Sequence, residues 1–277
     1  MSDSTPSHGL TGVARTLLTP LYARAHAAEL LPSAGLDDPV AARLLDEAGH
    51  TGSEVLADRG NTLGSIHRTI AFDILTRRFA REHPEGTVVS AGIGLCTRAH
   101  RLADEVPDTL RWAGVDRPEV IELRRGLLPG ERTRLHPASL ADPDWADTLV
   151  TGPDADPGPV LVLAEGVLMY LEPGELTSFL DVCRRAFGPG TEVVADYFHP
   201  RIALSDRHPI VKATGARFRS GARDGNRLAR FAPGWELAAE YGIMERISPL
   251  HRAAGLLFRT VTLGSRPYAV ARLRATA

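Results

Sequence analysis

Apolar positions in the first third of the chain recur at the spacing of amphipathic helices. The pattern predicts helices at about 12–31, 38–48 and 62–82, and Asp37-Asp38-Pro39 is a typical start for the second. No run typical of a strand precedes residue 87. We therefore expect residues 1–86 to form an N-terminal helical cap on the domain that follows.

From residue 87 onwards, short apolar runs alternate with helical patterns. The predicted strands lie at 88–91, 110–116, 133–136, 159–165 and 191–197. One helix is expected after Asp142-Pro143, and another from about Glu172 to Phe187. This alternation predicts an α/β domain over 87–277, with a parallel sheet covered by helices on both faces.

The last part of the chain departs from this rhythm. Residues 235–241 suggest a helix, 242–247 a strand and 250–263 a mixed apolar segment. A final strand is expected at 268–274. Two late strands with a long connection fit a sheet that finishes with an antiparallel strand, and the stretch around 199–235 is expected to be a lid-like insertion.

The first predicted strand runs into a Gly-x-Gly turn at Gly92 and Gly94. Glycine has no Cβ, so the backbone can turn sharply there and approach a ligand closely. The third glycine of the dinucleotide fingerprint is replaced by Thr97. Asp116 ends the second strand 22 residues after Gly94, where an adenosine ribose would present its hydroxyls. Asp116 is also a candidate N-cap for the helix that Pro118 begins, and the two roles are compatible.

Further polar groups fall at the predicted carboxyl ends of strands, where open parallel sheets bind ligands. They are the Ser139-Leu140 turn, Glu165 and the stretch 196–199. Glu165 ends an apolar strand and Gly166 follows it, so we expect its carboxylate to face a cleft. A catalytic pair of carboxylates is less favoured, because Asp116 and Glu165 both fit ribose or amine recognition.

Composition limits the remaining choices. The chain has 277 residues, 43% of them hydrophobic and 24% charged, which suits one domain with an appended region. No apolar run of membrane-spanning length and no leader peptide is visible, so we expect a cytoplasmic protein without a membrane partner. The two cysteines form no disulfide framework, and no zinc spacing occurs, so no metal is expected. Cys183 fits a buried apolar helix stripe.

The net charge of −2 argues against nucleic acid as a partner. The charge is unevenly spread, because residues 201–230 hold eight basic side chains against two acidic ones. This segment is either a solvated loop or a lid whose arginines, Arg217 and Arg219 first among them, draw in an anionic acceptor.

Several sequence blocks appear in one order over about residues 15–200. They are Leu21-Tyr-Ala-Arg-Ala25 with Asp37-Asp-Pro-Val-Ala41, Arg68 with Asp73, 88–98 through Arg101-Leu102, Val115-Asp-Arg-Pro-Glu-Val-Ile121, Ser139-Leu140 with Trp145, and Ala164-Glu-Gly-Val-Leu-Met-Tyr-Leu171. In these blocks the chain resembles the leucine carboxyl methyltransferase family, in particular bacterial members linked to polyketide and other secondary-metabolite O-methylation.

The resemblance implies a class I methyltransferase fold (a Rossmann-like sheet) and S-adenosyl-L-methionine as cofactor. It implies that Arg68, with Arg24 as a helper, binds the methionine carboxylate, whereas without it Arg68 would be read as a helix-surface residue. It places Glu165 near the ammonium and sulfonium. The remaining implied contacts are Gly92 and Gly94 at the amino-acid end, Asp116 at the ribose, Ser139 and Leu140 at the adenine, and Tyr170 on the substrate side.

Two positions depart from the family pattern. Cys96 stands where the family usually has Asp, and Gly114 where it usually has Glu. The first change removes an expected hydrogen bond that fixes the loop, and the second removes a polar contact near the cofactor. Either change could weaken cofactor binding.

The predicted function is O-methylation of a small molecule or modified peptide, with a carboxylate as the expected acceptor. A carboxylate is already ionised and needs no general base. A phenol or hydroxyl acceptor would be helped by one, and Tyr197 and His199 are the nearest candidates. The competing hypotheses are an NAD-dependent oxidoreductase and a non-catalytic cofactor-binding protein.

Overall fold

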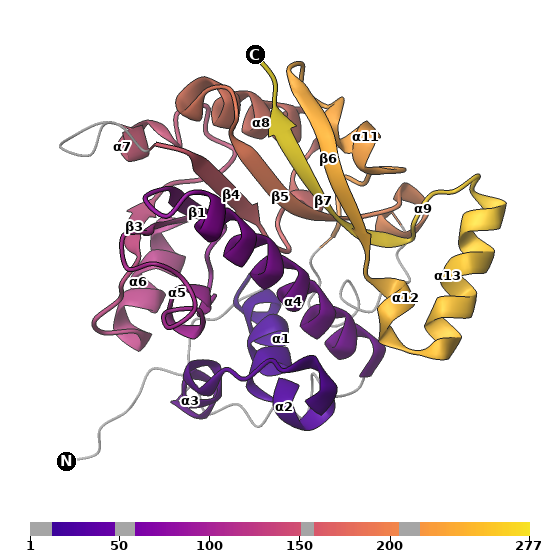
Figure 1. Ribbon diagram of the computed structural model, residues 1–277, viewed down its shortest axis with the longest axis horizontal. Coiled ribbons are helices and arrows are strands. Elements are labelled where there is room, and N and C mark those ends of the chain that lie inside the picture. The colour runs from indigo at the N-terminus through magenta and orange to yellow at the C-terminus, as the bar shows by residue number, and fades with distance from the viewer. Residues whose placement is uncertain (1–12, 48–58, 151–157, 205–216) are drawn as a thin grey trace.

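One seven-stranded sheet organises the chain. The computed structural model describes residues 13–47, 59–150, 158–204 and 217–277, and the strand order is β3-β2-β1-β4-β5-β7-β6 (Figure 1). The strands are β1 (Thr87–Ala91), β2 (Arg111–Asp116), β3 (Arg134–Pro137), β4 (Val160–Ala164), β5 (Glu192–Phe198), β6 (Trp235–Gly242) and β7 (Tyr268–Ala275). The first five are parallel, and β7 is antiparallel to both neighbours. The α/β sheet with a final antiparallel strand is therefore confirmed.

Helices cover both faces of this sheet. The long α4 (Arg59–Glu82) crosses one face, where Phe72 and Phe79 join Val88 and Leu161 in an apolar cluster. On the other face lies α8 (Pro173–Phe187), whose start is fixed by a capping box between Glu172 and Glu175.

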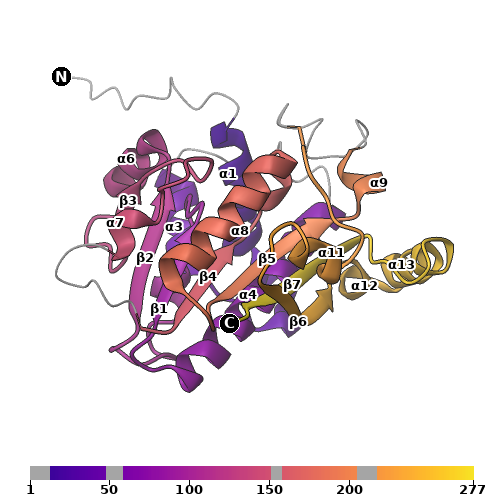
Figure 2. The same ribbon diagram turned by 90° about the horizontal axis from the view of Figure 1, so that it is seen from above.

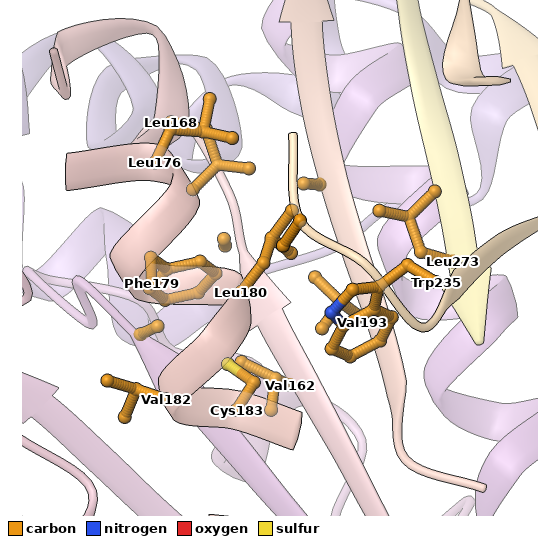
Figure 3. Packing of buried hydrophobic residues seen from close by; sticks show 14 of the residues in the cluster. Val162, Leu168, Leu176, Phe179, Leu180, Val182, Cys183, Val193, Trp235 and Leu273 are labelled. Carbon is orange, nitrogen blue, oxygen red and sulfur yellow. The ribbon is translucent and has the colours of Figure 1, made fainter. Parts of the chain in front are cut away.

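The α8 face holds the largest apolar cluster. Figure 3 shows Phe179, Leu180 and Cys183 of α8 turned towards Val162 and Val193 of the sheet. Cys183 is fully buried, as its helical stripe predicted. Shorter helices connect the strands: α5 (Arg98–Arg101), α6 (Pro118–Leu127), α7 (Asp147–Val150), α9 (Pro200–Ala203) and α11 (Gly225–Ala229).

The front of the chain is helical, as predicted. It contains α1 (Val13–Ala25), α2 (Ala27–Leu30), the short 3-10 helix at Pro32–Ala34 and α3 (Pro39–Glu47). Leu21 and Tyr22 of α1 pack with Leu44 of α3 and with Leu95, which follows the Gly-x-Gly turn. In Figure 1 these helices lie together beside one end of the sheet. By contrast, α4 packs directly on the strands, so it belongs to the layers of the sheet.

The assignments for residues 235–263 are corrected by the structure. Residues 235–241 form β6 instead of a helix, and 242–247 contain the helix α12 (Met244–Ile247) instead of a strand. Apart from buried Trp235, β6 is exposed or half-buried at the sheet edge, so its residues carry little apolar alternation. The local sequence of β6 favours a helix, but hydrogen bonding to β7 holds it in an extended conformation. The mixed segment is α13 (Pro249–Val261), which Ser248 caps by accepting a hydrogen bond from the His251 N–H.

The expected insertion around 199–235 is described only in part. Its described portion contains α9 and α11, whereas residues 205–216 lie outside the described residues. Across the described ranges, no helix combines the length and apolar character needed to cross a membrane.

The packing of Phe179 gives a test of the α8 layer. Its ring is fully buried and stacks on Trp145 at a centroid distance of 5.5 Å. We expect Phe179→Ala to lower the free energy of unfolding by about 3–5 kcal/mol, because it leaves a cavity in a packed core. Leu257→Ala, at a side chain that is 67% exposed, should change it by less than about 0.5 kcal/mol. Urea denaturation measures both, and similar losses would contradict the packing described.

Candidate active site

A cavity of about 830 Å³ opens at the carboxyl ends of β1, β2 and β4. The predicted cofactor and substrate residues all line it: Arg24, Arg68, Gly92, Gly94, Asp116, Ser139, Leu140, Glu165, Tyr170, Arg217 and Arg219. They come from segments spread over 196 positions of the sequence. The sheet thus brings these side chains to a single cavity, while their individual roles remain predictions.

The Gly-x-Gly turn forms one side of the cavity and requires glycine. Gly92 and Gly94 have φ angles of +69° and +47°, which residues with a Cβ rarely adopt. A Cβ on Gly92 would lie 2.5 Å from Val167 Cγ2, and one on Gly94 would lie 2.6 Å from Leu17 Cδ2. The positive φ angles therefore favour glycine at both positions, and a larger residue would also require Val167 or Leu17 to move.

Asp116 holds this turn in place. Its Oδ2 accepts a hydrogen bond of 2.8 Å from the Gly94 N–H, and its Oδ1 accepts one of 2.8 Å from the Arg117 N–H. The N-cap of α6 is Arg117, and no side chain caps that helix end. Asp116 therefore fixes the turn by accepting its hydrogen bond, and it does not cap the helix. Burial raises the pKa of Asp116.

A buried ion pair supports the same turn from behind. Arg124 is fully buried, donates to the Gly94 carbonyl oxygen over 3.0 Å, and donates through Nε to Glu131 Oε2 over 2.7 Å. Burial alone would raise the pKa of Glu131, but hydrogen bonds from His100, Thr133 and Arg124 and the charge of Arg124 lower it to about 2. Sequence reasoning missed this support, because Arg124 reads as an ordinary helix-surface residue.

Glu165 lies between two guanidinium groups. Its Oε1 accepts from Arg68 Nε at 3.1 Å and from the Thr69 hydroxyl at 3.1 Å. Its Oε2 accepts from Arg98 Nη2 at 2.6 Å. Burial would raise the pKa of Glu165, but Arg98 and Arg68 hold it well below its usual range. The carboxylate is ionised, and its charge is largely offset before any ligand binds.

Arg68 is buried, and only some of its hydrogen-bond donors have partners in the described protein. Besides Glu165, its Nη1 reaches Asp196 Oδ2 at 3.2 Å and the Tyr268 hydroxyl at 3.4 Å. Among the described residues, its Nη2 has no hydrogen-bond partner. Only 8% of Arg68 is exposed, so it is not a helix-surface arginine. Its free donors and its place on the cavity wall suit a carboxylate ligand.

A chain of ion pairs continues from Arg98 to Arg24. Arg98 Nε donates to Asp73 at 2.7 Å, and Arg101 binds both Asp73 and Asp38, the latter at 2.6 Å. Arg24 lies 3.3 Å from Asp38 and donates to the Leu95 carbonyl oxygen. Sequence reasoning assigned no role to Arg98 or Asp73, although both lie in the blocks that carried the resemblance.

The two departures from the family pattern have local explanations. Cys96 Sγ accepts a contact from Arg98 Nη1 at 3.4 Å, so a thiol takes the position of the usual carboxylate beside this arginine. A Cβ on Gly114 would collide with Ile93 Cδ1. The Ile93 side chain thus fills the space that a longer residue at 114 would need.

An aromatic wall lies on another side of the cavity. Phe198 and Phe218 stack at 5.2 Å with an angle of 21° between the rings, and Tyr170 meets Phe218 edge-on at 5.2 Å. Arg217 and Arg219 flank Phe218, and Arg219 pairs with Glu172 at 3.0 Å. This wall offers flat apolar surface beside cationic groups.

Tyr197 and His199 are placed away from this cavity. Side chains alternate along β5, so Tyr197 enters the apolar cluster under α8, whereas Phe198 faces the cavity. His199 caps α9 by accepting from the Arg201 N–H, and its ring contacts Phe258. The prediction that they serve as a base for an acceptor in this cavity is therefore corrected. In the described parts of the chain, no group of three His, Cys, Asp or Glu could hold a metal ion.

The sheet order and a cavity at the strand ends define a class I methyltransferase fold. A solved structure from Thermobifida fusca, described as a putative methyltransferase, shares it, with a TM-score of 0.59 and 19% identity over 92% of this chain and 94% of that one. The model of the leucine carboxyl methyltransferase family matches residues 18–183. The chain belongs to this family.

Curated relatives agree with this assignment. A tetracenomycin polyketide synthesis O-methyltransferase from Streptomyces glaucescens is 31% identical over 238 residues, which cover 85% of each chain. A protein named as an S-adenosyl-L-methionine-dependent methyltransferase from Parafrankia is 30% identical over 87% of this chain and 75% of its own. The predicted family, methyltransferase class and cofactor are thereby confirmed.

The support of the turn by Glu131 predicts a pH dependence. The pKa of Glu131 is about 2 in the folded protein, below the value of about 4.3 expected in the unfolded chain. The stabilisation is therefore complete above the unfolded value and is lost as the pH falls towards 2. We expect wild type to exceed Glu131→Gln in stability at pH 6 and the difference to shrink below pH ~4. Denaturant titrations at several pH values measure this, and parallel curves would contradict it.

Proposed function

We propose that the protein forms a methyl ester at a carboxylate of a small molecule or modified peptide in the cytoplasm, using S-adenosyl-L-methionine. The observation that carries this proposal is the meeting of the Gly92–Gly94 turn, Asp116 and a partly free Arg68 on one cavity. An acid beside a glycine turn suits a ribose, and free guanidinium donors suit an amino-acid carboxylate.

The residues present fit this cofactor. When bound, it supplies an electrophilic methyl group on a sulfonium. Arg68 Nη2 would bind its carboxylate, and Arg24 would assist. Each oxygen of Asp116 accepts one N–H, which leaves lone pairs for ribose hydroxyls. Ser139 and Leu140 would flank the adenine.

Glu165 has a narrower role than the resemblance implied. Three of its lone-pair positions are taken by Arg68, Thr69 and Arg98. It would therefore offer at most one further hydrogen bond to the ammonium group. We assign it chiefly to orienting Arg68 at the cavity wall.

An ionised acceptor fits the cavity better than a phenol. Tyr197 and His199 lie away from it, and burial raises the pKa of Tyr170 on its wall to about 12. The Tyr170 hydroxyl is therefore protonated at neutral pH, when it can donate a hydrogen bond but is a weak base. Rate enhancement would come from holding the acceptor oxygen near the methyl group and excluding water. Phenol methylation is the second candidate.

The aromatic wall supports a flat acceptor. Phe198, Phe218 and Tyr170 line the cavity, and the relative from Streptomyces glaucescens is named for polyketide synthesis. Arg217 and Arg219 would attract an acceptor carboxylate. Transfer of a labelled methyl group from the cofactor to a panel of aromatic acids tests the activity. Absence of transfer to every acid and phenol, with cofactor binding retained, would favour a non-catalytic binding protein.

The ribose contact predicts the effect of Asp116→Ala. We expect affinity for S-adenosylhomocysteine to fall by about 1–3 kcal/mol, because a charged acceptor is lost from a partly dry site. Titration calorimetry measures the change. An affinity equal to that of wild type would limit Asp116 to holding the turn.

The carboxylate contact predicts a selective effect of Arg68→Ala. Affinity for S-adenosylhomocysteine should fall by tenfold or more, since a charge-assisted pair is worth about 1.5–3 kcal/mol. Affinity for methylthioadenosine, which lacks the amino acid, should change much less. Arg125→Ala, at an exposed surface pair, is the control. Equal losses for the two ligands would show that the substitution acts through folding.

Electrostatic attraction of the acceptor predicts a salt dependence. We expect kcat/KM for an aromatic acid to fall as added salt shortens the Debye length from about 10 Å at 0.1 M. The double variant Arg217→Gln/Arg219→Gln should have a higher KM and a weaker salt response. A wild-type rate that is independent of salt would contradict this role. Residues 205–216 of the basic segment lie outside the described residues, so a lid stays a prediction.

A further inference from the structure

Tyr268 lies behind the cavity wall and does not line the cavity. It contacts residues of both the proposed cofactor side (Arg68) and the proposed acceptor side (Phe198). It is the first residue of β7 and pairs with Phe198 of β5 across the antiparallel register. Only 9% of its surface is exposed. The proposed function gives it no role.

The hydroxyl of Tyr268 belongs to the cofactor side. It donates to Asp196 Oδ2 at 2.8 Å and accepts a longer contact of 3.4 Å from Arg68 Nη1. The other oxygen of Asp196 accepts from the Gly166 N–H at 2.6 Å. Asp196 is therefore fixed at both oxygens, and it in turn fixes Nη1 of Arg68.

This arrangement sets the direction of Arg68. Glu165 accepts from Nε of Arg68, and Asp196 accepts from its Nη1, so the planar guanidinium has one orientation. In this orientation Nη2 remains available to a ligand. Gly166 has a φ of +69°, and a Cβ there would lie 3.1 Å from Arg68 Nη1. The turn after β4 and the guanidinium are thus closely packed. Burial holds the pKa of Tyr268 well above its usual value, so the hydroxyl remains a donor.

The ring of Tyr268 belongs to the acceptor side. It stacks on Phe198 with a centroid distance of 4.2 Å and an angle of 12°. Phe198 stacks in turn on Phe218. The ring is therefore the innermost layer of the aromatic wall and limits where Phe198 can lie.

We propose that Tyr268 is a positioning residue for both ligands: its hydroxyl orients Arg68 for the cofactor carboxylate, and its ring supports the Phe198–Phe218 wall for a flat acceptor. This inference rests on the proposed function. It assigns the two parts of one side chain to two ligands. Tyr268→Phe removes the hydroxyl alone, and the difference between Tyr268→Leu and Tyr268→Phe reports the ring.

Tyr268→Phe removes the hydroxyl and keeps the ring. We expect affinity for S-adenosylhomocysteine to fall about three- to tenfold, the worth of one buried hydrogen bond. Affinity for methylthioadenosine and for 2-naphthoate, a flat carboxylate probe, should stay within twofold of wild type. Tyr241→Phe makes the same chemical change on the neighbouring strand β6 and is the matched control. Calorimetry measures binding, and thermal unfolding verifies that each variant folds.

Phe218→Leu tests the aromatic wall at a ring that stacks on Phe198, as the Tyr268 ring does, but that makes no hydrogen bond to Asp196 or Arg68 in the contacts described above. We expect weaker binding of 2-naphthoate, by about threefold or more, since an aromatic pair is worth about 0.5–1.5 kcal/mol. Binding of S-adenosylhomocysteine should be unchanged. Tyr268→Leu should weaken 2-naphthoate binding by about threefold or more relative to Tyr268→Phe, and equal binding by the two variants would overturn the role of the Tyr268 ring.

The outcomes distinguish this inference from the proposed function. Failure of wild type to bind S-adenosylhomocysteine would overturn the proposed function. If wild type binds it and Tyr268→Phe binds it equally well, only the positioning role of the hydroxyl is overturned. Equal losses for S-adenosylhomocysteine and methylthioadenosine would also overturn that role. A Phe218→Leu variant that binds 2-naphthoate like wild type would overturn the role of the stacked wall.

Discussion

The structure depends on the requirement that a buried charge be paired. Glu165 directly follows β4 in the interior and remains ionised because Arg68 and Arg98 flank it. Each arginine, being buried itself, needs a further carboxylate, which Asp196 and Asp73 provide. Removing one member of such a network leaves an uncompensated charge, a loss of about 3–5 kcal/mol. The pairing thereby fixes the relative positions of α4, α5, β4 and β5 at the edge of the cavity.

The sheet explains why these charges can meet. In a parallel sheet, strands from distant parts of the chain end at the same edge, and β1 lies between β2 and β4. The glycine turn, Asp116 and Glu165 therefore share one crevice. In Figure 2, α8 lies in front of the strands of the sheet. The helical front of the chain contributes through Arg24, which joins the charge network from α1.

Local patterns made a large part of this predictable. The first five strands, the turn at Gly92 and Gly94, and the acids Asp116 and Glu165 are each visible within a few residues of sequence. The errors have physical causes. β6 is an edge strand held by its neighbour, and Tyr197 points to the face opposite its two neighbours. Asp73 reaches Arg98, and Asp196 and Tyr268 reach Arg68, only after folding, so no local spacing could have paired them.

The contact between Gly114 and Ile93 has a consequence for how this site can diverge. An acidic side chain at 114 cannot be accommodated while Ile93 keeps its present position. The two positions are coupled, because a side chain at 114 and the present rotamer of Ile93 compete for the same space. An acid at 114 therefore requires either another rotamer of Ile93 or a smaller residue at position 93.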